Sequence, residues 1–204
     1  MYNPKHFHET DPVQVAALMA DHPLAVVVAQ GDQGFQANHL PLFAAPDGAL
    51  IGHVAIGNGL HELPDGRPVL AIFQGVQGYI SPNSYPSKAK HHRAVPTWNY
   101  QVVHVHGQIS FQHDMQAKRA AVALLTRLYE RRVNGDAAWR MADAPADFLD
   151  QMLAGIVAFR ITPERVEAKS KLSQNRDDRD LTGAVGDLFA RGEDALAEAM
   201  RRRR

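Results

Sequence analysis

The sequence contains no cysteine, and this absence excludes disulfides, thiolate metal sites and a cysteine nucleophile. Charge of either sign is not in excess, because 22 Lys and Arg residues balance 22 Asp and Glu residues. A domain that attracts nucleic acid through its overall charge is therefore not indicated. No apolar run approaches bilayer length, and the first residues show no basic-then-apolar signal pattern, so we expect a cytoplasmic protein with no membrane partner.

Patterns typical of several enzyme classes are absent as well. There is no G-x-S-x-G nucleophile elbow, no G-x-G-x-x-G or P-loop fingerprint and no H-E-x-x-H pair. The acidic residues fall in predicted turns and on helix faces, so paired carboxylates for acid–base catalysis are not evident. The sequence therefore names no catalytic residue and leaves open whether the protein is an enzyme.

What the chain does contain is an ordinary globular composition, 45% hydrophobic and 22% charged over 204 residues. Runs rich in β-branched residues, separated by turn residues, predict strands at 24–30, 35–43, 48–56, 68–74, 102–111 and 156–161, the last continued through 166–169. Strands joined mostly by short turns favour an antiparallel arrangement. The predicted class is α+β with an antiparallel β-barrel core.

Helices are predicted from caps and apolar spacing. Asp11 and Pro12 start a helix that His22-Pro23 ends. Asp114 caps a helix over 115–132 that Asn134-Gly135 closes. On one side of this helix lie Ala120, Leu124, Leu125 and Leu128, and further helices are predicted at 146–153, 182–190 and 194–200. We expect a main domain over 1–180, with inserted helices at about 114–153, and a helical appendage over 181–204.

The stretch from Tyr79 to Gly107 is the most unusual one. Three prolines within it rule out a continuous helix or central strand, and four aromatic residues and many hydrogen-bonding side chains lie among them. Long loops of this kind are uncommon in compact domains and often functional. Two interpretations remain open, an ordered surface loop pinned by its own aromatics and the wall of a binding site.

Eleven histidines are a second unusual feature. His104 and His106 are two residues apart on a predicted strand, so their side chains share a face and could ligate a metal. A third ligand is not evident, and a hydrogen-bonded polar strand face is the favoured interpretation. We expect no metal site.

The segment Lys169–Arg176 combines three cations with four small polar side chains. Such groups can receive a phosphate, although charge runs are more often solvated loops. The terminal Arg201–Arg204 run could touch phosphates, but a solubilising tail that favours the helix dipole is the simpler interpretation.

Eight motifs together resemble the PaiB family of FMN-binding negative transcriptional regulators. They are MYNPKHF (1–7), NHLPL (38–42), GHVA (52–55), IFQG (72–75), YISPNSYPSK (79–88), VPTWNY (95–100), VHVHG (103–107) and KSKLSQNR (169–176). The resemblance covers nearly the whole chain. It implies a homodimeric, split-barrel flavoprotein that represses transcription, either directly or indirectly. No groove-reading element supports direct DNA binding.

The resemblance also implies a flavin cleft. The positions it places near FMN are His39, Leu40, Pro41, His53, Val54, Asn58, Lys88, Trp98, Asn99, Lys171, Ser173 and Gln174. One position departs from the pattern, because Ile56 stands where the family has an Arg after GHVA. If that Arg holds the FMN phosphate, its loss costs a charge-assisted contact of roughly 1.5–3 kcal/mol and weakens FMN binding.

Two functions of other classes are compatible with the same residues. A flavin-dependent oxidoreductase could enclose a small molecule between the histidine-bearing strands and the aromatic loop. A haem-binding or haem-degrading split barrel could use a histidine as axial ligand.

Overall fold

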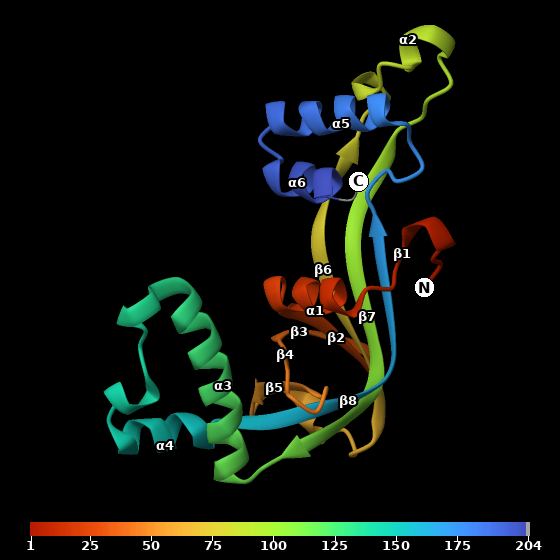
Figure 1. Ribbon diagram of the computed structural model, residues 1–204. Coiled ribbons are helices and arrows are strands. Elements are labelled where there is room, and N and C mark those ends of the chain that lie inside the picture. Colours follow the sequence, from red (N-terminus) through yellow and green to blue (C-terminus); the bar gives the residue numbers. More distant parts are fainter. Residues whose placement is uncertain (203–204) are drawn as a thin grey trace. The chain divides into compact units, whose positions relative to one another are not determined.

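The computed structural model describes residues 1–202, and its contacts divide the chain into two compact units. The terminal unit comprises Met1–His22, Phe73–His104 and Glu167–Arg204, and the central unit comprises Pro23–Ile72 and Val105–Val166. Figure 1 shows the elements of both units along the chain. The three longest strands contribute to both units, because each passes from one to the other partway along its length.

Eight strands form one sheet in the hydrogen-bonded order β3-β2-β6-β7-β8-β5-β4, with β1 paired to β8. Their bounds are β1 His8–Glu9, β2 Leu24–Gly31, β3 Gly34–Pro41, β4 Phe43–Ala44, β5 Leu50–Ala55, β6 Arg67–Ile80, β7 Thr97–Gln112 and β8 Ile156–Lys171. The β1–β8, β2–β3, β2–β6, β4–β5 and β5–β8 pairs are antiparallel. The sheet and its helices confirm the α+β antiparallel prediction.

The helices are α1 Pro12–Asp21, α2 Lys88–His91, α3 Met115–Asn134, α4 Ala146–Ala154, α5 Asp178–Ala190 and α6 Asp194–Arg202. Short 3-10 turns cover Lys5–Phe7, Gly59–Glu62, Pro82–Ser84, Gly135–Ala137 and Met141–Asp143. Asp11 caps α1 by accepting a hydrogen bond from the Val13 amide, as predicted. Asp114 caps α3 in the same way, and Gly135 ends it at a φ of 53°. Local cap residues thus set both helix starts.

The core of the central unit lies along β2, β5 and β8. Small and branched side chains from alternate positions, such as Val27, Val54 and Ile161, are buried there. Gly52 on β5 permits the close approach of Phe159, since a Cβ at Gly52 would lie 2.5 Å from its ring. The Phe43 ring packs edge-on against Tyr129 of α3, with the centroids 5.7 Å apart. This packing ties α3 to β4.

The core of the terminal unit is built from α5, α6 and the ends of β6 and β8. Its buried side chains are Ile80, Tyr85, Leu172, Leu181, Ala184, Leu188, Leu196, Ala197, Ala199 and Met200. Gly183 of α5 lies so close to the loop after β6 that a Cβ there would meet the Ser84 carbonyl oxygen at 2.2 Å. The loop and α5 are therefore packed against one another.

Several predicted bounds are corrected by the structure. The 35–43 strand ends at Pro41, and Phe43–Ala44 pairs instead with β5. The 68–74 and 102–111 strands extend to 67–80 and 97–112, so the irregular segment shrinks to 81–96. All three prolines lie inside that shorter segment, which explains both its start and its end.

The long helix α3 departs from its predicted packing in one respect. Its buried residues are Lys118 and Ala121, whereas Leu128 is 46% exposed. The strand predicted in two pieces, at 156–161 and 166–169, is continuous as β8. The position 180/181, where we expected the main domain to end and the helical appendage to begin, falls inside α5.

Among residues 1–202, no helix combines the length and apolar character needed to cross a membrane. Arg203 and Arg204 of the predicted basic tail lie outside the described residues.

Candidate functional site

The turn that follows β8 is held by side chains of the predicted basic segment. The Leu172 amide donates to Gln174 Oε1 at 2.7 Å, and Gln174 Nε2 donates to the Ser170 carbonyl oxygen. Ser173 has a φ of 64°, in the left-handed region. Its hydroxyl accepts a hydrogen bond from Asn99 Nδ2 at 2.8 Å, and both residues are buried. The segment is therefore a built turn and not the solvated loop considered from sequence.

Lys171 is fixed at the end of β8. Its Nζ donates to Thr97 Oγ1 and to the Trp98 carbonyl oxygen, the latter at 2.7 Å. Burial lowers the pKa of Lys171, and the positive charge of Lys169 lowers it further. Two neighbouring cations at one strand end are a suitable receptor for an anionic group.

Lys169 is buried among aromatic rings. Its Nζ lies 5.1 Å from the ring centroid of Tyr100, 5.6 Å from that of Tyr2 and 6.0 Å from that of Phe7. It donates to the Tyr2 carbonyl oxygen at 3.1 Å. Cation–π contacts of this kind compensate a lysine for lost water. Lys169 is thus a structural cation whose field acts on Lys171.

Trp98 and Tyr79 form an aromatic pair on neighbouring strands β7 and β6. Their ring centroids are 6.3 Å apart, and the side chains are 49% and 43% exposed. Trp98 Nε1 donates to Gln77 Oε1 at 3.1 Å, which fixes the indole. The two rings are inclined at 60°, so each offers its own half-exposed apolar face beside the Lys171–Trp98 contact.

The serines of the 81–96 segment serve its own structure. Ser81 caps the following turn, and Ser84 Oγ donates to the Ser81 carbonyl oxygen at 2.6 Å. The Ser87 amide and hydroxyl both donate to the buried Asp180 carboxylate, at 2.9 and 2.6 Å. These contacts support the interpretation that serines in this loop satisfy local groups. Lys88 donates to Asn83 Oδ1.

The central unit holds the other predicted flavin residues on β3 and β5. Asn58, just past β5, donates from Nδ2 to Asn38 Oδ1 of β3 at 2.8 Å. Its Oδ1 accepts from the Leu60 amide and so caps the next turn. The structure therefore brings the end of β5 and β3 together.

Other members of this set differ in accessibility. His39 is exposed on β3, next to Leu40 and Pro41, whereas Val54 is buried and points into the core. Burial lowers the pKa of His53. These differences separate side chains that can meet a ligand from those that pack the sheet.

Ile56, where the resemblance led us to expect an arginine, is 58% exposed. Its amide donates to the Gly155 carbonyl oxygen at 2.8 Å, and its carbonyl oxygen contacts His61 Nε2 at 2.8 Å. The backbone is thus fixed while the side chain is free of the core. An arginine would fit here without repacking.

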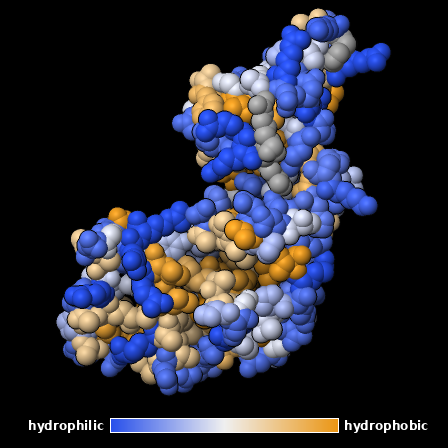
Figure 2. All heavy atoms as spheres, in the orientation of Figure 1, coloured by the Kyte–Doolittle hydropathy of each residue, from blue (hydrophilic) through white to orange (hydrophobic). Residues whose placement is uncertain are grey.

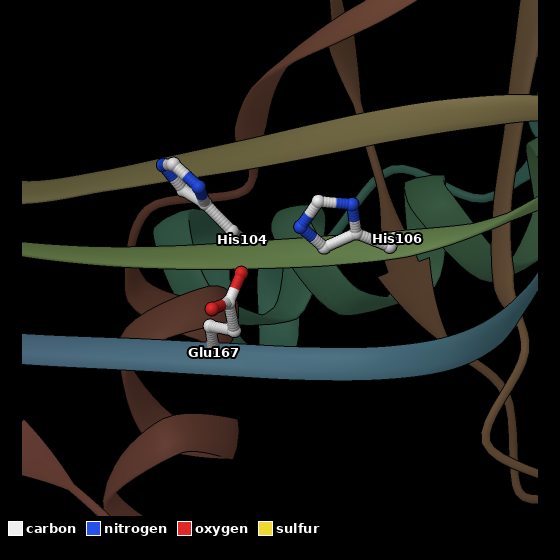
Figure 3. Close-up of side chains that lie close together, drawn as sticks. All are labelled: His104, His106 and Glu167. Carbon is white, nitrogen blue, oxygen red and sulfur yellow. The ribbon is translucent and has the colours of Figure 1, made fainter. Parts of the chain in front are cut away.

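Figure 3 shows His104 and His106 on β7 and Glu167 on neighbouring β8. His104 and Glu167 belong to the terminal unit, and their candidate ligand atoms lie within 4.8 Å of each other. Glu167 already pairs with the Met1 amine at 3.3 Å. Sequence reasoning missed Glu167, whose signal was its place on a strand next to β7.

Comparison with known proteins gives the family. Residues 1–165 match the family model described as "Putative FMN-binding domain". The chain is 32% identical over 192 residues to Protease synthase and sporulation protein PAI 2 of Bacillus subtilis, covering 92% of this chain and 89% of that protein. It is 27% identical over 172 residues to Uncharacterized protein AN0679 of Emericella nidulans, covering 80% and 68%.

Solved structures are similar in fold. An FAD and heme binding protein from Mycobacterium smegmatis has a TM-score of 0.61 at 19% identity, covering 86% of this chain and 78% of that one. The flavocytochrome Anf3 from Azotobacter vinelandii has a TM-score of 0.60 at 12% identity, covering 86% and 75%. The split-barrel fold class is confirmed. The chain therefore belongs to the FMN-binding family that contains PAI 2, the PaiB family of the sequence resemblance, and FMN is the cofactor assigned by that membership.

Proposed function

We propose that this protein is a dimeric FMN-binding split-barrel protein that acts as a negative regulator of transcription, indirectly through its flavin-bound state. The observation that carries the proposal is the 32% identity over 92% of the chain to a protein named for protease synthesis and sporulation. The balanced charge of the chain favours an indirect role over direct DNA binding. Arg201 of the basic tail already pairs with an acidic residue of its own helix, because it lies 2.8 Å from Glu198.

Lys171 and Trp98 are the residues of the terminal unit that fit FMN best. Lys171 is a fixed, partly buried cation to which the neighbouring Lys169 adds positive charge, and such groups can receive a phosphate. Trp98 presents a half-exposed ring to the isoalloxazine system. When bound, FMN supplies the ability to accept and return electrons.

Asn99, Ser173 and Gln174 act on the same site as positioning residues in this proposal. Asn99 and Ser173 are buried, and their contacts fix the turn that begins at Lys171. In the central unit, exposed His39 and half-buried Asn58 are the members of the predicted set best placed to meet a ligand. The other proposed contacts are Leu40, Pro41, His53 and Lys88, whereas Val54, the remaining member of the set, is buried in the core.

A titration of FMN fluorescence with purified protein tests the assignment of Lys171. We expect Lys171→Met to weaken FMN binding about tenfold to hundredfold, because a charge-assisted phosphate contact is lost. Lys90→Met, which removes an exposed lysine of α2, serves as the matched control and should bind FMN as the parent does. Equal affinities of the parent and Lys171→Met would remove Lys171 from the site.

A mobility-shift assay with DNA upstream of the protein's own gene, at two salt concentrations, tests the indirect role. We expect no shift, or an equal shift with random DNA that disappears at the higher salt concentration. A salt-resistant shift specific to that sequence would overturn indirect action.

The two other functions lead to different spectra. An oxidoreductase would have its bound flavin reduced by NAD(P)H without oxygen and reoxidised by an acceptor. A haem protein would shift the Soret band of added haem, a test made relevant by the haem named for the M. smegmatis structure. Our proposal predicts neither result.

A further inference from the structure

The central unit contains a groove of about 520 Å³ beside α3. One wall is formed where β2 begins and β3 ends, at Leu24 and its partner Pro41. The rest of the lining is Pro23, Trp139 and four residues of α3, which are Leu125, Thr126, Tyr129 and Glu130. The volume is in the range of small-molecule sites. Figure 2 shows apolar side chains gathered over and beside α3.

Glu130 is the one charged residue among the described residues that line this groove. Its Oε2 accepts hydrogen bonds from the Asn134 side chain at 2.7 Å and from the Trp139 amide at 2.9 Å. Within residues 1–202, Oε1 accepts no hydrogen bond. The hydrogen bond from the Trp139 amide, and to a smaller extent the one from the Asn134 side chain, lower the pKa of the Glu130 carboxyl. The groove therefore carries a negative charge at neutral pH.

One of these contacts also fixes the backbone of Trp139. The Trp139 amide is tied to Glu130, nine positions earlier, so the carboxylate and the indole are held at one groove. A neighbouring cavity of about 370 Å³ contains Arg127 and Arg131, which are not in the lining of the first groove. Glu130 and Trp139 line both spaces, whereas the arginines line only the second, so Glu130 is the one charged residue on the first groove. An anion with two aromatic rings and aliphatic walls selects a cation with an apolar body.

We propose that the groove beside α3 binds a small apolar amine, with its ammonium group at Glu130 Oε1 and its hydrocarbon body against Trp139, Tyr129 and Leu125. The charge complementarity of Glu130 favours this occupant over a second copy of the chain. The site stands independently of FMN binding at Lys171. It gives the proposed regulator a place for an effector.

NMR of the indole N–H signals tests the site, because the chain has two tryptophans, Trp98 and Trp139. Trp98→Phe assigns the two signals. The probes are 2-phenylethylamine, the neutral 2-phenylethanol and the anionic 3-phenylpropanoate, titrated into the flavin-loaded full chain. We expect the amine to shift the Trp139 signal, with about tenfold higher affinity than the alcohol, and the carboxylate to bind more weakly still.

Glu130→Gln keeps an oxygen for the Asn134 and Trp139 donors but removes the charge. It should abolish the preference for the amine, whereas Glu164→Gln, the matched control on β8, should keep it. Equal binding of amine and alcohol by the parent protein, or a shift confined to Trp98, would overturn the proposal without any variant. If instead Leu24→Asp converts a dimer to a monomer, the groove is covered by a second copy and the proposal is wrong.

Discussion

Asn99 donates a hydrogen bond from Nδ2 to Ser173 Oγ, 74 positions later in the chain, at 2.8 Å, and both side chains are buried. The same Nδ2 lies 3.4 Å from Met200 Sδ. One amide therefore joins β7, the turn after β8 and α6. This turn begins at Lys171, the proposed phosphate ligand, so the buried hydrogen bond positions the site without touching the flavin.

The Asn99–Ser173 pair should be energetically coupled. We expect Ser173→Ala and Asn99→Ala each to lower the free energy of unfolding by about 1–3 kcal/mol, because each leaves a buried polar group without its partner. The double variant should lower the free energy of unfolding by less than the sum of the two single variants, since the one hydrogen bond between them is lost only once. Urea denaturation of the three variants measures this coupling. Strict additivity would show that the two side chains act separately.

Two glycines of α5 provide a matched test of the packing between α5 and the 81–96 segment. Gly183→Ala should destabilise the protein by about 1–3 kcal/mol, because the new Cβ meets the Ser84 carbonyl oxygen. Gly186 is on the same helix, and a Cβ there would have no atom of another segment within 4 Å. Gly186→Ala should therefore stabilise the protein by about 0.5–1 kcal/mol. Thermal unfolding compares them. A similar effect of both substitutions would contradict the close contact.

His53 should make the protein sensitive to mild acid. Burial lowers its pKa in the folded state below the usual histidine value of about 6.5. The unfolded chain therefore binds the proton first as the pH falls, and stability is lost from about pH 6.5 down to the folded pKa. His53→Gln should flatten this part of the stability–pH profile. His39→Gln, an exposed histidine on β3, should leave it in place, and the opposite ranking would refute the burial argument.

Ile56→Arg should strengthen FMN binding. The side chain is exposed, so arginine can be added without overpacking, and it restores the residue expected from the family pattern. We expect a gain of about tenfold in affinity, the lower end of a charge-assisted phosphate contact. Val133→Arg places the same charge on an exposed position of α3 and serves as control. If both variants gain equally, net charge and not a contact is responsible.

Local signals in the sequence predicted much of the fold. Asp11-Pro12, Asp114 and Asn134-Gly135 set helix ends through contacts within a few residues, and all three predictions are confirmed. The lengths of β6, β7 and β8 were underestimated, because pairing with neighbouring strands extends them through polar residues that carry no strand signal alone.

The candidate site was less predictable for the same reason. The resemblance located the segments that contain Trp98 and Lys171, but a sequence does not show which side chains are buried. Asn99 and Ser173 are buried at contacts that join distant segments. The groove at Glu130 was missed because Trp139 lies nine positions from it in an irregular stretch, and no periodic pattern connects them.

The absorbance spectrum of the purified protein, before and after adding FMN, tests the central claim most directly. We predict flavin absorption bands in the protein fraction, about one FMN per chain after saturation, and quenching of the flavin fluorescence on binding. A colourless protein that leaves the fluorescence of added FMN unchanged would contradict the assignment of FMN as its cofactor.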